Sequence, residues 1–493
     1  MNKASQSNIN QLMQDGRSVA QQFRRSTREA PVCRFSSDST DPFVSYVLEL
    51  VSDFSGVRFE VVSGHRQQHV DIYYGNDRNV NSTIRISEAC YTLDNIPSVP
   101  TAGDFACARS QAPFPFDLFR AVRFWLTDAG NDIADTNAFD QHERLLTAFS
   151  AQEKLGIREV PIVNAYLMLL RSYIEERLGT RTQDRLLGGH RCIVVLSHDV
   201  ENPMANDYLH KLWLAGVALL NDRPRGFAAE IRNAFLRGSS KDRPPQFGEI
   251  TDAEEEVGFR STFFFSAVSN CEGHPLDNSY DVRAPYFRTV MQRLTERGWE
   301  VGVHLSYNAR RSAAQIAAER ERIEHVGGCK VLGSRHHYWH MSRPIWRTLE
   351  DHEKAGLAYD ASLAFNERPG YRLGIAYPFY PWSPVSQRPV RTLQIPTACM
   401  DGSFFYDPSL TVDGFIEHFG TLLESLKRFN GVACVDWHEY TSVRTGTTFK
   451  KWGEAYLELL KLLASDHSVA VCSCAELLQA MNQKEELADS HVV

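Results

Sequence analysis

Four apolar runs in this chain each end in a cluster of residues that can bind metal ions or move protons. The clusters are Ser197-His198-Asp199-Val200-Glu201, His304-Leu305-Ser306-Tyr307-Asn308, Arg335-His336-His337-Tyr338 and Asp436-Trp437-His438-Glu439. In a parallel β/α array the carboxyl ends of all strands open on one face, so residues far apart in sequence meet there. The sequence therefore predicts a single active site built from these clusters.

Asp199 follows closely after four apolar residues, Ile193 to Leu196, that we expect to be buried. A carboxylate there needs a partner or a metal, because burying it alone is very costly. Asp199 could instead cap a following helix, since Asp is a good N-cap residue. His198 and Glu201 flank it, however, and three ligand types in four positions exceed what a cap requires. We therefore expect Asp199 and Glu201 to take part in the chemistry.

His304 and Asn308 are four residues apart, so on a helical turn both point the same way and could hold one ion or one substrate group. Imidazole suits zinc, whereas an amide oxygen is a weak ligand for it. A histidine buried in the core with its hydrogen bonds satisfied is the alternative for His304.

Arg335 stands beside two imidazoles at another strand end. Alternation along an extended chain sends His336 and His337 to opposite sides, so at most one of them enters the pocket. Arg335 could hold a carboxylate in its ionised form. The alternative for Arg335 is a salt bridge at the rim of a sheet.

His438 is a candidate proton donor, with Asp436 two residues earlier and Glu439 next. A histidine that a carboxylate orients can supply a proton near neutral pH. Asp360 is a candidate for that carboxylate, although an Asp at this place could simply form a turn.

The elements that must position these residues form a regular pattern after Cys192. Short apolar strands alternate with amphipathic helices, which predicts βα units and a parallel sheet. The expected strands are 192–197, 261–268, 300–304, 331–334, 358–364, 393–397, 431–436 and 468–473. The expected helices are 286–298, 312–326, 344–355, 412–429 and 453–465. Seven or eight units favour a deformed (β/α) barrel over an open sheet.

A chain of 493 residues exceeds what one core usually fills, which predicts two domains. Residues 1–185 read as a smaller α+β domain, with helices at 44–56, 116–127 and 161–178 and strands at 57–62 and 70–74. Residues 186–493 read as the α/β barrel. A helical insert at about 202–250 separates its first two strands and could cover the pocket.

The composition of the chain restricts the kinds of molecule that we expect it to bind. A net charge of -8 argues against nucleic acid and anionic membrane, since both attract basic surfaces. The sequence shows no apolar run of membrane-spanning length and no signal-peptide core, so we expect a cytoplasmic protein. The ten cysteines include no C-x-x-C pair, and we assign them no chemistry. The composition does not indicate an oligomeric state.

Aromatic residues near the clusters could bind a substrate. The proline-rich span 377–396 is a rigid loop that contains Trp382, and at a barrel mouth it could form one wall of a cleft. Surface packing is the alternative. Together with Tyr307 and Tyr338 from the clusters, Trp382 is our candidate for substrate contact.

The order of these motifs over about 190–480 resembles the polysaccharide deacetylase (NodB homology) family. Besides the clusters, the resemblance includes Ser261-Thr262-Phe263-Phe264-Phe265 and Gly333-Ser334-Arg335. It implies a deformed (β/α) barrel of NodB type and a divalent metal, usually zinc, that serves to remove acetyl groups from N-acetylated sugars. Residues before about 185 are similar to an accessory region that precedes the barrel in a bacterial subgroup.

The resemblance also implies roles for individual residues. Asp199 falls in the first motif, where two aspartates supply a base and a metal ligand. Val200 replaces the second aspartate, so Glu201 or His198 must take that role. His304 matches the first histidine of the second motif, while Asn308 stands where the second histidine is expected.

Three later motifs complete this correspondence. Arg335 matches the arginine of the third motif, Asp360 the aspartate of the fourth, and His438 the proton-donating histidine of the fifth. The implied metal site is Asp199 and His304, completed by Asn308 or His336.

The expected function is thus metal-dependent hydrolysis of an acetyl or other acyl group from an N-acetylated sugar or a small acylated amine. One alternative is a hydrolase of another non-peptide C–N bond, with a metal site rebuilt around Asn308. A second alternative is a catalytically silent carbohydrate-binding protein with a metal-free pocket lined by Trp382, Tyr380 and Trp339.

Overall fold

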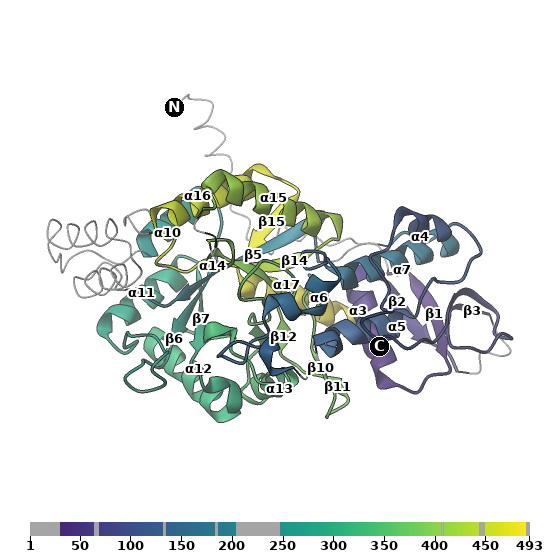
Figure 1. Cartoon of the computed structure of the whole chain (residues 1–493), viewed down its shortest axis with the longest axis horizontal. Coiled ribbons are helices and arrows are strands. Elements are labelled where there is room, and N and C mark those ends of the chain that lie inside the picture. The colour runs from purple at the N-terminus through teal and green to yellow at the C-terminus, as the bar shows by residue number, and fades with distance from the viewer. Residues whose placement is uncertain are drawn as a thin grey trace, which may run out of the picture.

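The computed structural model describes residues 30–63, 69–131, 135–182, 186–203, 247–405, 407, 409–442 and 449–489. Most of the predicted insert at 202–250 lies outside the described residues. Figure 1 shows a four-stranded sheet at one end of the molecule and a larger curled sheet surrounded by helices at the other. Among the described residues, no helix is both long and apolar enough to cross a bilayer.

The larger sheet has nine strands, all paired in parallel. In chain order they are β5 (Cys192–Val200), β6 (Thr262–Ser266), β7 (Glu300–Leu305), β8 (Gly333–His336), β9 (Tyr359–Asp360), β12 (Leu393–Gln394), β13 (Thr397–Met400), β14 (Val432–Asp436) and β15 (Val469–Cys472). The sheet runs in the order β12-β9-β8-β7-β6-β5-β14-β13, and β15 pairs with the first half of β5. Every strand predicted from the sequence is present.

The two edges of this sheet lie close together. The path begins at β12 and ends at β13, which only Ile395 and Pro396 separate in the chain. The three Cα–Cα steps from Gln394 to Thr397 span no more than about 11 Å, so the sheet must curl until its edges approach each other. Pro396 cannot donate a ladder hydrogen bond, and it divides the single strand predicted at 393–397. The predicted α/β fold with a deformed barrel is confirmed.

Helices cover the outside of the curled sheet, as Figure 1 shows. They are α10 (Phe247–Glu256), α11 (Pro285–Glu296), α12 (Ala313–Gly327), α13 (Trp346–Lys354), α15 (Val412–Arg428), α16 (Lys450–Ser465) and α17 (Cys474–Asp489). The apolar faces of α10, α11, α12, α15 and α16 and the outward side chains of the strands form one of the two large cores. The buried apolar side chains of α13 and α17 belong to the other large core. Inward side chains such as Val195 and Phe264 also belong to a hydrophobic core, and the inward polar side chains at the carboxyl ends of the strands build the site.

Alternation along β5 separates the residues of the first cluster. Asp199 points toward the Arg335 side chain of β8. His198 points the opposite way, where its Nε2 lies 2.9 Å from a carboxylate oxygen of Glu254 on α10 and its Nδ1 lies 2.6 Å from the carbonyl oxygen of Trp437. Both histidine nitrogens are occupied in this buried network, so His198 ties α10 to the sheet and takes no part in the site.

The smaller sheet contains β1 (Val32–Ser37), β2 (Arg58–Val61), β3 (Val70–Tyr74) and β4 (Ser82–Ile86), in the order β2-β1-β3-β4. Its helices are α3 (Pro42–Ser55), α5 (Leu118–Leu126) and α7 (Ile162–Leu178). The Asp41 side chain accepts a hydrogen bond from the Phe43 N–H at the start of α3, and Gly56 ends that helix with φ 70°. This part shares a continuous hydrophobic core with the curled sheet, and the domain boundary at 185 stays a prediction.

Glu300, at the amino end of β7, is a buried carboxyl group that titrates near neutral pH. It accepts hydrogen bonds from Thr262 (2.6 Å), Tyr359 (2.8 Å) and the Ala475 N–H (2.7 Å), but burial outweighs them and raises its pKa to about 7. Between about pH 4.5 and about pH 7 the folded protein therefore binds more protons than the unfolded chain. The free energy of unfolding should fall over this window, by up to about 3 kcal/mol.

Replacing Glu300 with Gln should remove that pH dependence, because the amide is neutral at every pH. Urea unfolding at about pH 5 and about pH 8 measures it. A Glu300→Gln slope equal to that of the wild type would contradict the assignment.

Candidate active site and metal centre

The centre of the site is the carboxylate of Glu201, directly after β5. One of its oxygens, Oε1, lies 3.4 Å from Nε2 of His304 at the end of β7 and 3.2 Å from Nε2 of His337, which follows β8. The ligand atoms of these three residues all lie within 4.8 Å of one another. The three strand ends are neighbours in the sheet, because β5, β6, β7 and β8 are adjacent.

This donor set fits a divalent cation. Nδ1 of His304 lies 3.2 Å from the backbone carbonyl of Arg335, which fixes the proton on Nδ1 and turns the Nε2 lone pair toward Glu201. Among the described residues, that Nε2 is buried and has no hydrogen-bond partner. Two imidazole nitrogens and one carboxylate oxygen are a common zinc set that leaves a position for water or substrate. The side chains of His304 and His337 are 1% and 7% exposed, and that of Glu201 is 21% exposed, so access is from the Glu201 side.

The structure does not bring Asn308 and His336, two of the residues proposed for the metal, to this cluster. Asn308 is exposed at the start of a short 3-10 helix, η4 (Ala309–Arg311). His336 points to the other side of the sheet, where its Nε2 lies 2.8 Å from Nε2 of His352 on α13. Alternation along β8 sends His337, not His336, toward Glu201.

A turn of unusual backbone conformation places His337. Tyr338 and Trp339 have φ angles of 60° and 52°, which are uncommon for residues other than glycine and cost free energy. Arg144, from the N-terminal part, donates hydrogen bonds to the Tyr338 carbonyl (3.0 Å) and to the side-chain oxygen of Asn366 (2.7 Å). The N-terminal part thus holds the turn that carries a candidate ligand.

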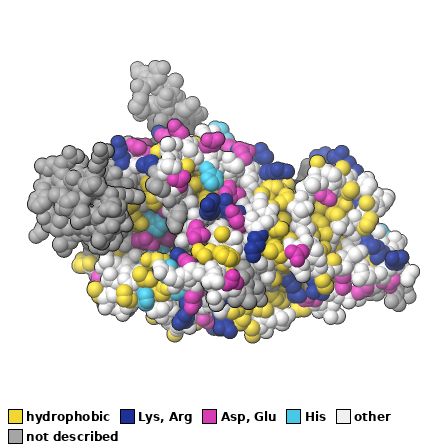
Figure 2. All heavy atoms as spheres, viewed as in Figure 1, with side chains coloured by type: hydrophobic (Ala, Val, Ile, Leu, Met, Phe, Trp, Pro, Cys, Tyr) yellow, Lys and Arg dark blue, Asp and Glu magenta, His cyan; other side chains and the backbone are white. Residues whose placement is uncertain are grey.

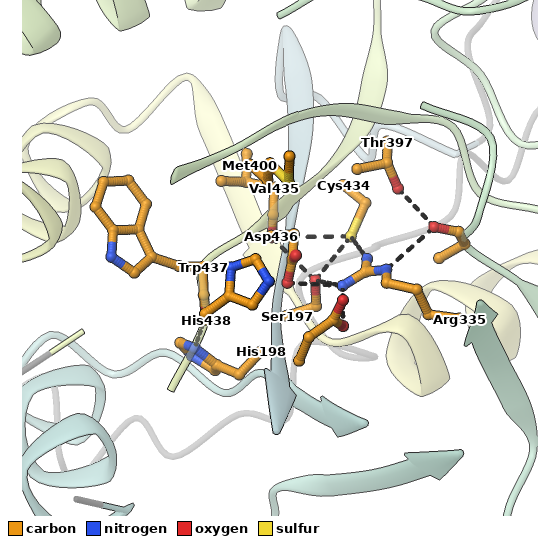
Figure 3. Close-up of polar contacts among 12 residues, drawn as sticks. Ser197, His198, Arg335, Thr397, Met400, Cys434, Val435, Asp436, Trp437 and His438 are labelled. Atoms are coloured by element: carbon orange, nitrogen blue, oxygen red, sulfur yellow. Dashed lines mark hydrogen bonds and ion pairs between the residues drawn. The ribbon is translucent and has the colours of Figure 1, made fainter. Parts of the chain in front are cut away.

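Arg335 is fully buried and holds two carboxylates at once (Figure 3). Its Nη1 donates to Asp199 (2.9 Å) and to Asp436 (2.8 Å), and also to the Ser197 hydroxyl (2.8 Å). Asp199, Asp436 and His438 also have ligand atoms close enough for a metal. The guanidinium, however, already supplies the positive charge between the two carboxylates, so we assign no metal to this second group.

The two carboxylates that share Arg335 differ in pKa. Burial would raise the pKa of Asp199, but the positive charges of Arg335 and the nearby imidazoles outweigh it, and the pKa lies below its ordinary value. Burial and the negative charge of Asp199 raise the pKa of Asp436 well above its ordinary value. Asp199 is therefore the carboxyl group that ionises first, and Asp436 keeps its proton to higher pH than Asp199.

His438 lies on the opposite side of Glu201 from His304 and His337. Its Nε2 is 3.6 Å from Oε2 of Glu201, and its Nδ1 is 2.8 Å from Oδ1 of Asp401. Burial alone would lower the pKa of His438, but the charges of Asp401 and Glu201 raise it well above its ordinary value. The histidine is thus held as an imidazolium, with Nε2 facing the cluster.

Asp401, not Asp360, is the carboxylate that orients His438. Asp401 begins α14 (Asp401–Phe405), directly after β13, and also accepts a hydrogen bond from Thr441. Asp360 lies on the far side of the sheet, 3.9 Å from His352. Its carboxylate accepts hydrogen bonds from Ser334, Ser362 and Gln394.

Two of the three aromatic residues predicted to bind substrate border the cluster. The ring of Tyr338 lies 4.6 Å from that of His337. Tyr307 lies 5.9 Å from Tyr338, and its hydroxyl is 3.1 Å from Nδ1 of His142, a residue of the N-terminal part. Trp382 instead packs against α3, with its ring 5.0 Å from that of Phe43.

Structural comparison finds polysaccharide deacetylases similar to this chain. One, from Mycobacterium smegmatis, has a TM-score of 0.39 and 14% identity over 60% of this chain and 92% of its own. Another, from Pseudomonas aeruginosa PAO1, has a TM-score of 0.39 and 11% identity over 60% and 93%. Peptidoglycan deacetylase PdaC from Bacillus subtilis has a TM-score of 0.29 and 14% identity over 61% and 97%.

These neighbours belong to the family that the sequence motifs resemble. Similarities of this size by themselves indicate neither a substrate nor a reaction. No protein-family model matches the chain, and no curated protein matches it in sequence.

Proposed function

We propose that this protein is a metal-dependent hydrolase that removes an acetyl group from an N-acetylated sugar. The observation that carries the proposal is the arrangement around Glu201, with His304 and His337 on one side and the His438–Asp401 pair on the other. Glu201, His304 and His337 would hold a divalent cation such as zinc. When bound, such a cation polarises the acyl carbonyl and makes a water molecule acidic enough to attack it.

Asp199 is the residue best placed to take the proton from the attacking water. Arg335 keeps it ionised and fixes its Oδ1 at 2.9 Å. Its other oxygen, Oδ2, lies 3.8 Å from Nδ1 of His304, beside the cluster. The guanidinium thus orients the base while leaving one oxygen able to accept a proton.

His438 is the residue that gives a proton to the departing amine. Hydrolysis of an amide needs this step, because an amide anion is too basic to leave without a proton. Asp401 holds the imidazole by Nδ1 and favours its charged form, so Nε2 presents a proton toward the cluster. The proposed acid, His438, and the proposed base, Asp199, then lie at the ends of different strands, on two sides of the Glu201 carboxylate.

A neutral substrate suits the distribution of charge on one face of the molecule. On the face that Figure 2 shows, acidic and basic side chains are interspersed and do not gather into a field of one sign. Such a surface favours neither a polyanion nor a polycation. A neutral glycan or a small acylated amine remains the expected substrate class.

The direct test is release of acetate from N-acetylglucosamine oligomers by the full-length, zinc-loaded protein. We expect free acetate and new primary amine in equal amounts, and neither product from protein stripped of metal. The Asp199→Asn variant is a second control. Binding of the oligomers without release of acetate would instead favour a catalytically silent carbohydrate-binding protein.

The turn that carries His337 gives a further prediction. Arg144→Ala should weaken metal binding by about 10–100-fold, the usual cost of losing an interaction that orients a ligand. Competition with a chelator measures this without any reaction. Arg347→Ala, which removes an exposed arginine of α13, is the control and should bind metal like the wild type. Unchanged metal affinity in Arg144→Ala would show that the turn keeps its conformation without Arg144.

A further inference from the structure

A cavity of about 690 Å³ lies next to the candidate active site, between the N-terminal part and the loops after β8 and β9. This volume falls in the range of about 300–1,000 Å³ that is typical of small-molecule sites. Trp339 lines the cavity, and its ring also lies 5.1 Å from the guanidinium of Arg335. One side chain therefore forms a wall shared by the cavity and the catalytic interior.

Aromatic side chains supply much of the cavity wall. Trp339 and Trp382 are 9% and 5% exposed, so they are fixed in place, and Trp346 at the start of α13 is half-buried. Phe139, from the N-terminal part, closes another side. Trp346 and Phe139 are the partly exposed rings of this wall. A flat, rigid aromatic face suits the apolar C–H face of a sugar ring at little cost in conformational entropy.

At least four of the five charged residues that line the cavity form ion pairs within the protein. Three ion pairs involve its lining residues: Arg372 with Asp128 (2.7 Å), Arg144 with Asp140 (2.7 Å) and Glu143 with Arg310 (2.5 Å). The guanidinium of Arg343 lies 3.3 Å from the centre of the Phe139 ring. A charged ligand would lose its hydration and meet mostly paired charges, so the lining favours a neutral one.

Polar groups that can bind hydroxyls also face this space. Asn131, Asn366 and the hydroxyls of Ser342 and Ser362 are among the lining residues. A few polar groups set among aromatic walls can orient a ligand that has both an apolar face and hydroxyl groups. A sugar unit has both. Asn131, Asn366, Ser342 and Ser362 already form hydrogen bonds within the protein, and their remaining donor and acceptor positions are the ones that could bind sugar hydroxyls.

We propose that this cavity binds neutral sugar units of the same glycan whose N-acyl group reaches the metal cluster, a proposal that rests on the proposed function. The substrate is then an oligosaccharide that occupies two adjoining sites. The N-terminal part supplies one side of the second site and so sets the preferred chain length.

Calorimetric titration of full-length, zinc-loaded His438→Ala protein tests this, since its slowed turnover leaves the ligand intact. The probes are N-acetylglucosamine oligomers of one to about five units. We expect affinity to rise about tenfold or more with length. Trp346→Ala should weaken binding of the longest oligomer by about tenfold. Trp452→Ala, a half-buried tryptophan of α16 outside the cavity, should stay within about twofold.

Equal binding of the longest oligomer to Trp346→Ala and its parent would overturn the proposal. Tighter binding of an octyl glycoside of N-acetylglucosamine than of the oligomers, dependent on Trp346, would assign the cavity to an apolar chain and also overturn it. Trp346→Leu, which keeps apolar volume but no flat face, gives the same comparison if Trp346→Ala does not fold.

The two proposals fail in different ways. Trp346-dependent binding without any acetate release would contradict the hydrolase and leave the sugar site standing. Acetate release with no dependence of binding on Trp346 would remove the sugar site alone.

Discussion

His438→Ala should lower kcat by about 10²–10⁴, the usual contribution of a positioned general acid. The leaving amine needs a proton, and Nε2 of His438, 3.6 Å from Glu201, presents one to the cluster. Steady-state deacetylation of an N-acetylglucosamine oligomer measures the effect. Because His438 is outside the proposed metal set, the bound zinc should stay at the wild-type level.

Asp401→Asn is the matched variant for this prediction. It keeps the shape of the partner but removes a charge that raises the pKa of His438. The fall in kcat on the alkaline side of the pH profile, where His438 loses its proton, should therefore come at lower pH than in the wild type. Undiminished turnover in His438→Ala would remove this histidine from the mechanism.

Arg335→Met should destabilise the protein by about 3–5 kcal/mol, the usual cost of breaking a buried ion pair by removing one partner. The guanidinium is fully buried, and Asp199 would be left as a buried charge without its cation. Urea unfolding at neutral pH measures the loss. Asp436→Asn is the control. The pKa of Asp436 is raised, and an amide resembles the protonated form of its carboxyl group.

We therefore expect Asp436→Asn to change the free energy of unfolding by less than about 1 kcal/mol. Equal losses in Arg335→Met and Asp436→Asn would mean that Asp436, too, is ionised. The assignment of Asp199 as the sole base would then no longer hold.

The strands and helices of the barrel could be predicted because their signals are local. Apolar runs alternate with amphipathic helices, and all strands expected after Cys192 are present. The predicted strand at 393–397 is the instructive exception, since Pro396 divides it into β12 and β13. Because the sequence predicts a single strand there, it does not indicate that Asp401 lies directly after the end of a second strand, β13. Asp401 is therefore missing from the predicted site.

The site could be predicted in part for the same reason. A polar residue directly after a buried strand reaches the carboxyl edge of the sheet, and the structure brings Asp199, Glu201, His304 and His438 together there. The residue spacing of the family's second motif, however, predicted Asn308 as a metal ligand, and Asn308 is exposed.

Alternation along β8 separates His336 from His337 and places His337 on the same side as Arg335. The turn after His337, in contrast, could not be predicted. The positive φ angles of Tyr338 and Trp339 are held by Arg144, nearly two hundred residues away in sequence. A contact of that range leaves no local signal in the sequence. His142 and the cavity beside the site were missed for the same reason, because they form only when the N-terminal part meets the barrel.

The most direct test of the central claim is the zinc content of purified wild type, His337→Ala and Asn308→Ala after dialysis against the same zinc buffer. We expect His337→Ala to lose the bound zinc, because it removes one of the three donors around Glu201. Asn308→Ala should keep the wild-type content. Full zinc in His337→Ala together with its loss in Asn308→Ala would contradict the proposed metal centre.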